Sequence, residues 1–233
     1  GGASGNYKET DFTMDISKKV KSNLEKAGIT VKLTHDEGDI DKNHVMDEYN
    51  KGGRAVIPNE VKSKYTFSIH INKSGSSKVK GIELYTPSDI NYDLTKDIVN
   101  NITSNTSLGY SSNRLYKKFD GIYTHNFTES EVKSAIDGYD EKNYKHYNVT
   151  TNSNYLYMIR ETGGFMTGAY IDSSNPDKVG VNPYYDSNIG NESYLLELGY
   201  ISNSTDVNTL KEEQDALAKA ISDSIIKEIN EKM

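Results

Sequence analysis

Three side chains of this sequence, Glu9, His70 and Glu197, combine the types that metal-assisted hydrolysis needs. Imidazole nitrogen and carboxylate oxygen bind zinc in open catalytic sites, where a remaining position holds water. Bound zinc lowers the pKa of that water toward about 7, and a nearby carboxylate takes its proton. A mononuclear zinc hydrolase therefore requires a set such as this one: an acid at the start of a helix, a histidine in a strand and an acid in a distant strand.

Glu197 is the most informative of the three. It is the single carboxylate in the apolar segment 194–201, and a buried acid needs a partner. That partner is a metal ion, a catalytic proton or an arginine, and an ion pair with Arg160 or Arg114 is the structural alternative.

His70 and Glu9 also have structural alternatives. His70 lies on the polar side of the alternating segment 65–72, where it is either a hydrogen-bonded structural residue or a metal ligand at the carboxyl end of a strand. Glu9 follows Asn6 by three residues, the spacing of a helix capping box. The other histidines lie in polar stretches and are expected to be solvated: His35, His44, His125 and His146.

The hydrophobic pattern predicts the elements that position these residues. Helices are expected from Asn6 to Gly28 and over residues 54–64, 91–102, 128–136 and 210–229. Strands are expected over residues 29–34, 65–72, 79–85, 155–159 and 194–198. Alternation of helices and strands predicts an α/β domain.

Composition narrows the class of protein further. The chain has 233 residues, a net charge of −7 and no cysteine, which excludes disulfide scaffolds, thiolate metal sites and cysteine nucleophiles. The negative charge argues against nucleic acid as a partner, and no apolar run is long enough to span a membrane. We expect one domain over residues 1–233, with insertions at about 117–152 and 163–191.

Several motifs resemble, in order, those of the zinc-dependent N-acetylmuramoyl-L-alanine amidases of bacterial cell walls. They are the opening GASG with YKE (2–9), AGITVKLT (27–34), FSIHIN (67–72), GIELY (81–85) and LELGYISN (196–203). Arg54 and Asn59 resemble the helix before the histidine strand, and YMIRET (157–162) resembles the segment before the catalytic strand. The resemblance spans nearly the whole chain.

This resemblance implies a mostly parallel central sheet with helices on both faces, an α/β sandwich. It implies Zn²⁺ as cofactor, Glu9 and His70 as zinc ligands, Glu197 as the catalytic carboxylate, and Asn72 and Arg160 as substrate-binding residues. The reaction would be hydrolysis of the amide between N-acetylmuramic acid and L-alanine in peptidoglycan. The protein would be a secreted or wall-associated autolysin.

The sequence departs from the family pattern in three places. The family's first zinc ligand, a histidine at the end of the first strand, would precede Gly1, so we expect that strand and ligand upstream of the sequence. His35 stands where the family usually has arginine and is a weak candidate for a substitute ligand. The expected helix at 128–136 could plug the site, with Glu129 or Glu131 offered to zinc, until an activator or a second wall-binding domain displaces it.

Two other functions are compatible with the same residues. One is a catalytically inactive peptidoglycan-binding or regulatory domain on the same fold. The other is a zinc carboxypeptidase-like enzyme, whose substrate-anchoring arginine would have to be Arg54, Arg114 or Arg160.

Overall fold

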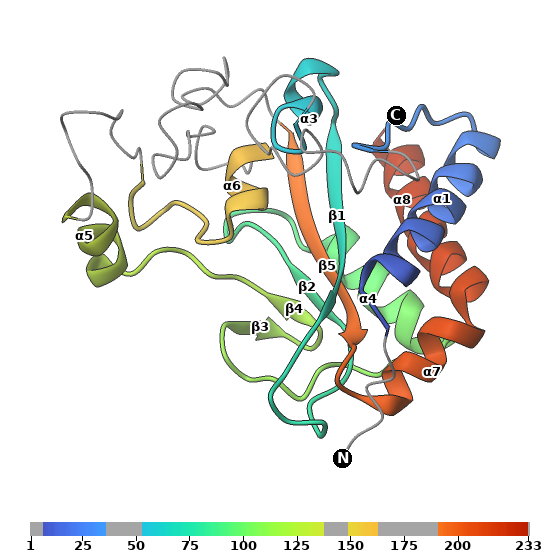
Figure 1. Ribbon diagram of the computed structural model, residues 1–233. Helices are drawn as coiled ribbons and strands as arrows, with labels where there is room; N and C mark the ends of the chain where they lie inside the picture. The colour runs from blue at the N-terminus through green and yellow to red at the C-terminus, as the bar shows by residue number, and fades with distance from the viewer. Residues whose placement is uncertain (1–6, 36–52, 138–148, 163–190, 233) are drawn as a thin grey trace.

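The computed structural model of the protein describes residues 7–35, 53–137, 149–162 and 191–232. They form the predicted α/β fold, built on a five-stranded sheet of order β1-β5-β2-β4-β3 (Figure 1). The strands are β1 (Tyr65–Asn72), β2 (Glu83–Tyr85), β3 (Lys117–Phe119), β4 (Ile122–Tyr123) and β5 (Glu192–Tyr200). The sheet is mixed, because the pairs β1–β5 and β2–β4 are parallel and the pairs β2–β5 and β3–β4 are antiparallel.

The helices are α1 (Thr10–Lys26), α3 (Ile57–Glu60), α4 (Asp93–Asn105), α5 (Glu129–Asp137), α6 (Tyr157–Thr162), α7 (Ser204–Glu212) and α8 (Gln214–Lys232). Helices α1, α4 and α8 pack together on one side of the sheet, and α6 lies on the other side (Figure 1). Within the described ranges, no helix is long and apolar enough to cross a bilayer.

Helix α1 forms because its apolar residues recur every four positions. Phe12, Ile16, Val20 and Leu24 are all buried in the main core, as the sequence predicts. Gly28 follows the helix with a φ of +82°, a conformation that favours glycine, so the predicted helix end is confirmed.

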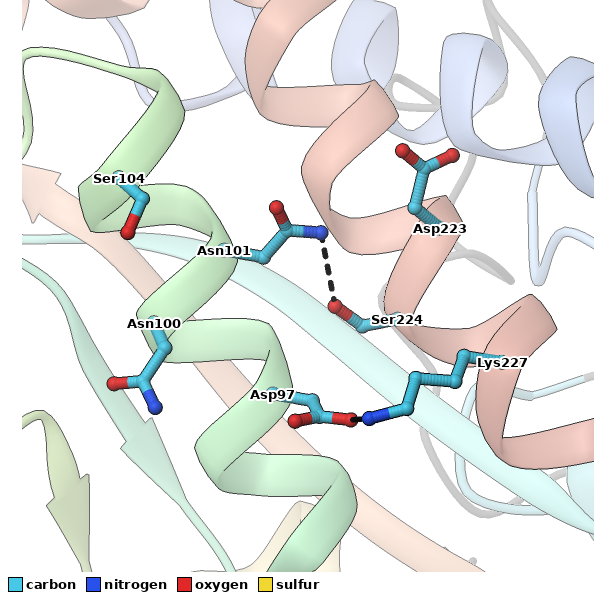
Figure 2. Close-up of a pocket in the computed structure, with 7 residues that line it drawn as sticks. All are labelled: Asp97, Asn100, Asn101, Ser104, Asp223, Ser224 and Lys227. Carbon is cyan, nitrogen blue, oxygen red and sulfur yellow. Dashed lines mark hydrogen bonds and ion pairs between the residues drawn. The ribbon is translucent and has the colours of Figure 1, made fainter. Parts of the chain in front are cut away.

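The seam between α4 and α8 contains a polar hollow of about 380 Å³ (Figure 2). Asp97 on α4 pairs with Lys227 on α8 at 2.5 Å. Asn101 donates from Nδ2 to Ser224 Oγ at 3.3 Å and to the Ala220 carbonyl at 3.0 Å. These groups bind one another across the seam, so we assign them to helix packing.

Two predicted strands are wrong. Residues 29–34 form no strand, although Ile29 and Val31 still pack against the core. The alternation of apolar and polar residues reflects which side chains face the core, whereas a strand also needs a hydrogen-bonded neighbouring strand. Residues 155–159 run into helix α6 instead, where Met158 and Ile159 are buried. The Asn154 side chain accepts a hydrogen bond from the Leu156 amide at 2.9 Å, the kind of local turn that Asn favours.

Other predicted elements have different lengths. The helix expected over 54–64 reduces to α3, with Pro58 in its first turn. The strand expected over 79–85 is only β2, and the closing helix is split into α7 and α8 at Glu213. Helix α5 confirms the expected helix at 128–136, whereas β3 and β4 lie in a region predicted as an insertion.

Candidate active site

The register of the sheet brings three titratable side chains into one row. His70 on β1 is paired with Glu197 on β5, and Glu197 is paired with Glu83 on β2. Paired residues of neighbouring strands project from the same face of a sheet. Residues separated by more than 100 positions in sequence are therefore neighbours across β1, β5 and β2.

The ends of β5 and β2 are fixed by one buried carboxylate. Asp206 Oδ2 accepts hydrogen bonds from the Gly81 amide at 2.8 Å and the Tyr200 amide at 2.9 Å. Gly199 has a φ of +84°, and a Cβ there would lie 2.9 Å from Asp206 Cβ. The glycine of the LELGY motif thus permits the close approach that holds the strand of Glu197 beside the strand of Glu83.

Glu9 reaches His70 and caps no helix with its side chain. The predicted capping box is wrong for Glu9, because Glu9 is itself the N-cap residue of α1 and its side chain makes no cap hydrogen bond. Asn6, the predicted N-cap, lies outside the described residues. Glu9 Oε1 lies 2.7 Å from His70 Nδ1 and accepts a hydrogen bond from the Ile71 amide at 3.0 Å. Burial disfavours the charge on Glu9, but these hydrogen bonds outweigh it and lower its pKa.

His70 is held at both ring nitrogens. Nε2 lies 2.9 Å from Ser68 Oγ, which leaves Nδ1 facing Glu9. Burial disfavours the imidazolium, but the hydrogen bond to Glu9 and the negative charges of Glu197 and Glu9 outweigh it and raise the pKa of His70. The ring is therefore oriented by a hydroxyl on one side and a carboxylate on the other.

Glu197 is the carboxyl group of the row that lacks a partner at one oxygen within the described part of the chain. Its Oε2 is buried and has no hydrogen-bond partner among the described residues. Burial, together with the charges of Glu9 and Glu83, raises the pKa of Glu197 from 4.5 to about 7 against the opposing effect of His70. The alternative ion pair is not formed, because Arg160 pairs with Glu161 at 2.8 Å and Arg114 is exposed.

Glu83 is a site residue that the sequence analysis missed. It is fully buried, and its Oε1 accepts hydrogen bonds from Ser111 Oγ at 2.6 Å and from the Tyr200 hydroxyl. Its Oε2 accepts from the Tyr85 hydroxyl at 2.7 Å and from Asn72 Nδ2 at 3.3 Å. A carboxylate in an apolar strand was the signal that identified Glu197, and the same signal would have found Glu83.

His125 corrects the prediction that it is solvated. It is only 7% exposed and is stacked between Tyr116 and Tyr155, with ring centroids 3.6 and 4.2 Å away. Its Nε2 lies 3.5 Å from Glu131 Oε1 on α5. His35 is partly exposed, whereas His44 and His146 lie outside the described residues.

The two predicted substrate-binding residues have different surroundings. Asn72 follows His70 on the same face of β1 and lines a cavity together with Glu197. Arg160 is 3% exposed and donates to Glu161, to the Asn154 carbonyl and to the Tyr155 carbonyl. Contact of either residue with substrate stays a prediction.

Two cavities flank the row. One, of about 370 Å³, contains Glu9 and His70 together with His35 and Arg54. The other, of about 330 Å³, contains Glu197, and α5 contributes Glu131 to its wall. Glu131 lines the cavity of Glu197 and not that of Glu9 and His70. Its carboxylate accepts hydrogen bonds from the Thr128 amide and hydroxyl at 2.7 and 2.9 Å.

The donor set of Glu9 and His70 fits a divalent metal ion in part. It offers one imidazole nitrogen and one carboxylate oxygen, which are zinc donors. Ser68 holds the second ring nitrogen, as the hydrogen-bonding partners of metal-binding histidines do. The described residues contain no group of three or more such side chains placed for one metal. The pair therefore accounts for two protein ligands.

Comparisons with known proteins identify the family of this chain. The family model described as N-acetylmuramoyl-L-alanine amidase matches residues 1–227. A comparison with curated protein sequences finds no match.

Solved amidase structures share the fold. The catalytic domain of CwlV from Bacillus (Paenibacillus) polymyxa var. colistinus has a TM-score of 0.56 at 21% identity, over 98% of this chain and 89% of that chain. CwlD of Clostridioides difficile, solved in complex with the GerS lipoprotein, has a TM-score of 0.54 at 19% identity, over 98% and 90%. AmiC2 of Nostoc punctiforme has a TM-score of 0.54 at 19% identity, over 97% and 87%.

Proposed function

Because this chain belongs to the N-acetylmuramoyl-L-alanine amidase family, we propose that it hydrolyses the amide bond between N-acetylmuramic acid and L-alanine in peptidoglycan, with zinc as cofactor. One observation supports this most strongly. A buried carboxyl group with an unpartnered oxygen, Glu197, lies beside a histidine that is already paired with Glu9. A fold that keeps such a group unsatisfied has a use for it in chemistry.

In this proposal Glu9 and His70 are two of the zinc ligands. Zinc supplies a Lewis acid for the amide carbonyl and a water of lowered pKa. Ser68 keeps the His70 ring in the orientation that presents Nδ1, and the Ile71 amide holds Glu9 Oε1 in place. These bonds keep both donors oriented before a ligand arrives.

Glu197 is the proposed general base and acid. Its raised pKa, about 7, lets it accept a proton from the attacking water near neutral pH. The protonated carboxyl then gives that proton to the amine of the leaving L-alanine. Glu197 Oε2 has no hydrogen-bond partner among the described residues, so it is available for these two transfers.

We also propose that the protein acts outside the cell or at the wall, as an autolysin. The membership in a cell-wall amidase family supports this location. A structural relative is recorded in complex with a lipoprotein, which makes an activating partner a reasonable expectation for this chain as well. Such a partner would act on α5 if that helix limits access to the cavity of Glu197.

Digestion of purified peptidoglycan by the full natural protein tests the function. We expect zinc-dependent release of stem peptides with a free L-alanine amino terminus, measured by mass spectrometry. His70→Ala and Glu9→Ala should each weaken zinc binding by about 10-fold or more, measured by competition with a chromogenic chelator. Glycan strands that keep all their peptides while zinc is bound would refute the amidase function and favour an inactive binding domain.

A further inference from the structure

A second binding feature adjoins Glu197 and does not follow from the motifs. The cavity of about 330 Å³ is walled by Glu197, Tyr85, Tyr116, His125, Glu131 and Tyr155, among others. We call it the tyrosine cavity. These residues come from β5, β2, the loops around β3 and β4, α5 and the segment before α6, so the fold assembles the cavity from distant parts of the chain.

The aromatic wall of this cavity is a stack of three rings. His125 is stacked between Tyr116 and Tyr155, with interplanar angles of 12° and 23°. Tyr116 adopts a φ of +62°, which is unusual for a residue other than glycine, and its carbonyl is held by the Thr124 amide at 3.0 Å. Both tyrosines remain 39–44% exposed, so their rings are available to a ligand.

The charge of the cavity is negative. Its described lining residues include the carboxylates Glu131 and Glu197 and no lysine or arginine. Burial lowers the pKa of His125 and so favours the neutral imidazole, and hydrogen bonds from Thr128 lower the pKa of Glu131. His125 Nε2 is buried and has no hydrogen-bond partner among the described residues, at 3.5 Å from Glu131.

An aromatic wall with a carboxylate beside it is suited to recognise an ammonium group, through cation–π contact and ion pairing. The substrate proposed above offers such a group where its stem peptide contains a diamino acid with a free side-chain amine. We propose that the tyrosine cavity binds the primary ammonium of that diamino acid, with Glu131 as its counter-ion and Tyr116 and Tyr155 as its aromatic contacts. This inference rests on the proposed amidase function.

Two muramyl tripeptides test the inference, one ending in L-lysine and one in Nε-acetyl-L-lysine. We expect the wild type to prefer the free amine by about fivefold in kcat/KM, the size of an exposed cation–π contact with an ion pair. Glu131→Gln should abolish this preference, and the glutamine still completes the capping box with Thr128. Glu129→Gln, an exposed acid on the same helix turn, is the matched control and should retain the preference.

Equal kcat/KM for the two substrates in the wild type, or a preference that Glu131→Gln leaves unchanged, would overturn the proposal. Binding of the free tripeptide and its acetylated form, followed by NMR titration of the aromatic resonances, gives a second readout that needs no turnover. Amine-dependent binding without cleavage of either substrate would support the tyrosine cavity and refute the amidase function. Cleavage of both substrates at equal rates would refute the tyrosine cavity alone.

Discussion

Two glutamates lie side by side in the sheet and have opposite surroundings. Glu83 on β2 and Glu197 on β5 are paired in register, and both lie in apolar strands. Glu83 is fully buried and accepts hydrogen bonds from three hydroxyl groups and one amide. Glu197 has a buried oxygen that accepts none from the described residues.

The difference separates a carboxylate that has a full set of donors from one that lacks a partner at one oxygen among the described residues. The donors around Glu83 replace the hydrogen bonds to water that the group lost on folding. The unpartnered oxygen of Glu197 has no such compensation, and its pKa rises to about 7. Burial alone therefore does not distinguish the two glutamates, whereas their hydrogen-bond donors do.

Exchange of each glutamate for glutamine should affect turnover very unequally. Glu197→Gln removes the proton acceptor and should lower kcat by about 10²–10⁴-fold, the usual contribution of a general base. Glu83→Gln should lower kcat by less than about tenfold, because Glu83 acts only through the positions of Tyr85 and Asn72. Release of peptides from peptidoglycan by the zinc-loaded variants gives both kcat values. Equal decreases in kcat would show that the two glutamates do not differ in their contribution to turnover.

The same two variants should change stability in opposite directions. At pH 8 without metal, Glu197→Gln removes a buried charge and should raise the free energy of unfolding by about 3 kcal/mol, from a pKa shift of 4.5 to about 7. Glu83→Gln places an amide among donors and should lower it by about 1–3 kcal/mol. Urea denaturation in the presence of a chelator measures both; a loss of stability in Glu197→Gln would contradict the assignment.

The pH dependence of that gain has a definite sign. Because the pKa of Glu197 is higher in the folded than in the unfolded protein, the folded state binds more protons between pH 4.5 and about 7. Stability of the wild type therefore falls in this window as the pH rises. The advantage of Glu197→Gln should be absent below pH 4.5, grow through the window and stay constant above it, as unfolding curves at several pH values will show.

The sequence singled out Glu197, Glu9 and His70 as candidates, but it did not predict their surroundings. A lone acid in an apolar strand indicates a group that needs a partner, and that reasoning applies equally to Glu83, which was overlooked. Glu83 receives hydrogen bonds from Ser111 and Tyr200, which are distant from it in sequence. Only the register of β2 with β5 reveals that these donors surround Glu83 and not Glu197.

Local patterns failed where tertiary contacts decide the structure. Residues 29–34 alternate as a strand does, but burial of Ile29 and Val31 against the core satisfies that pattern without strand pairing. His125 lies in a polar stretch and is buried because Tyr116 and Tyr155 stack on it from separate loops. Long amphipathic helices such as α1 and α4 were predictable, because their periodicity is contained in the segment itself.

The smallest effect should come from removing a single donor of Glu83. Tyr200→Phe deletes a hydroxyl that donates to the buried Glu83 Oε1 and should lower the free energy of unfolding by about 1–2 kcal/mol. Tyr194→Phe is the matched control on the same strand: its hydroxyl donates to Glu192 at 2.7 Å, and this carboxylate is partly exposed, so water can replace the lost donor. The control should cost less than about 1 kcal/mol. Thermal unfolding measures both losses of stability. If they are equal, the hydroxyl donors stabilise Glu83 no more than they stabilise a partly exposed carboxylate. The contrast with Glu197 would then rest on burial alone.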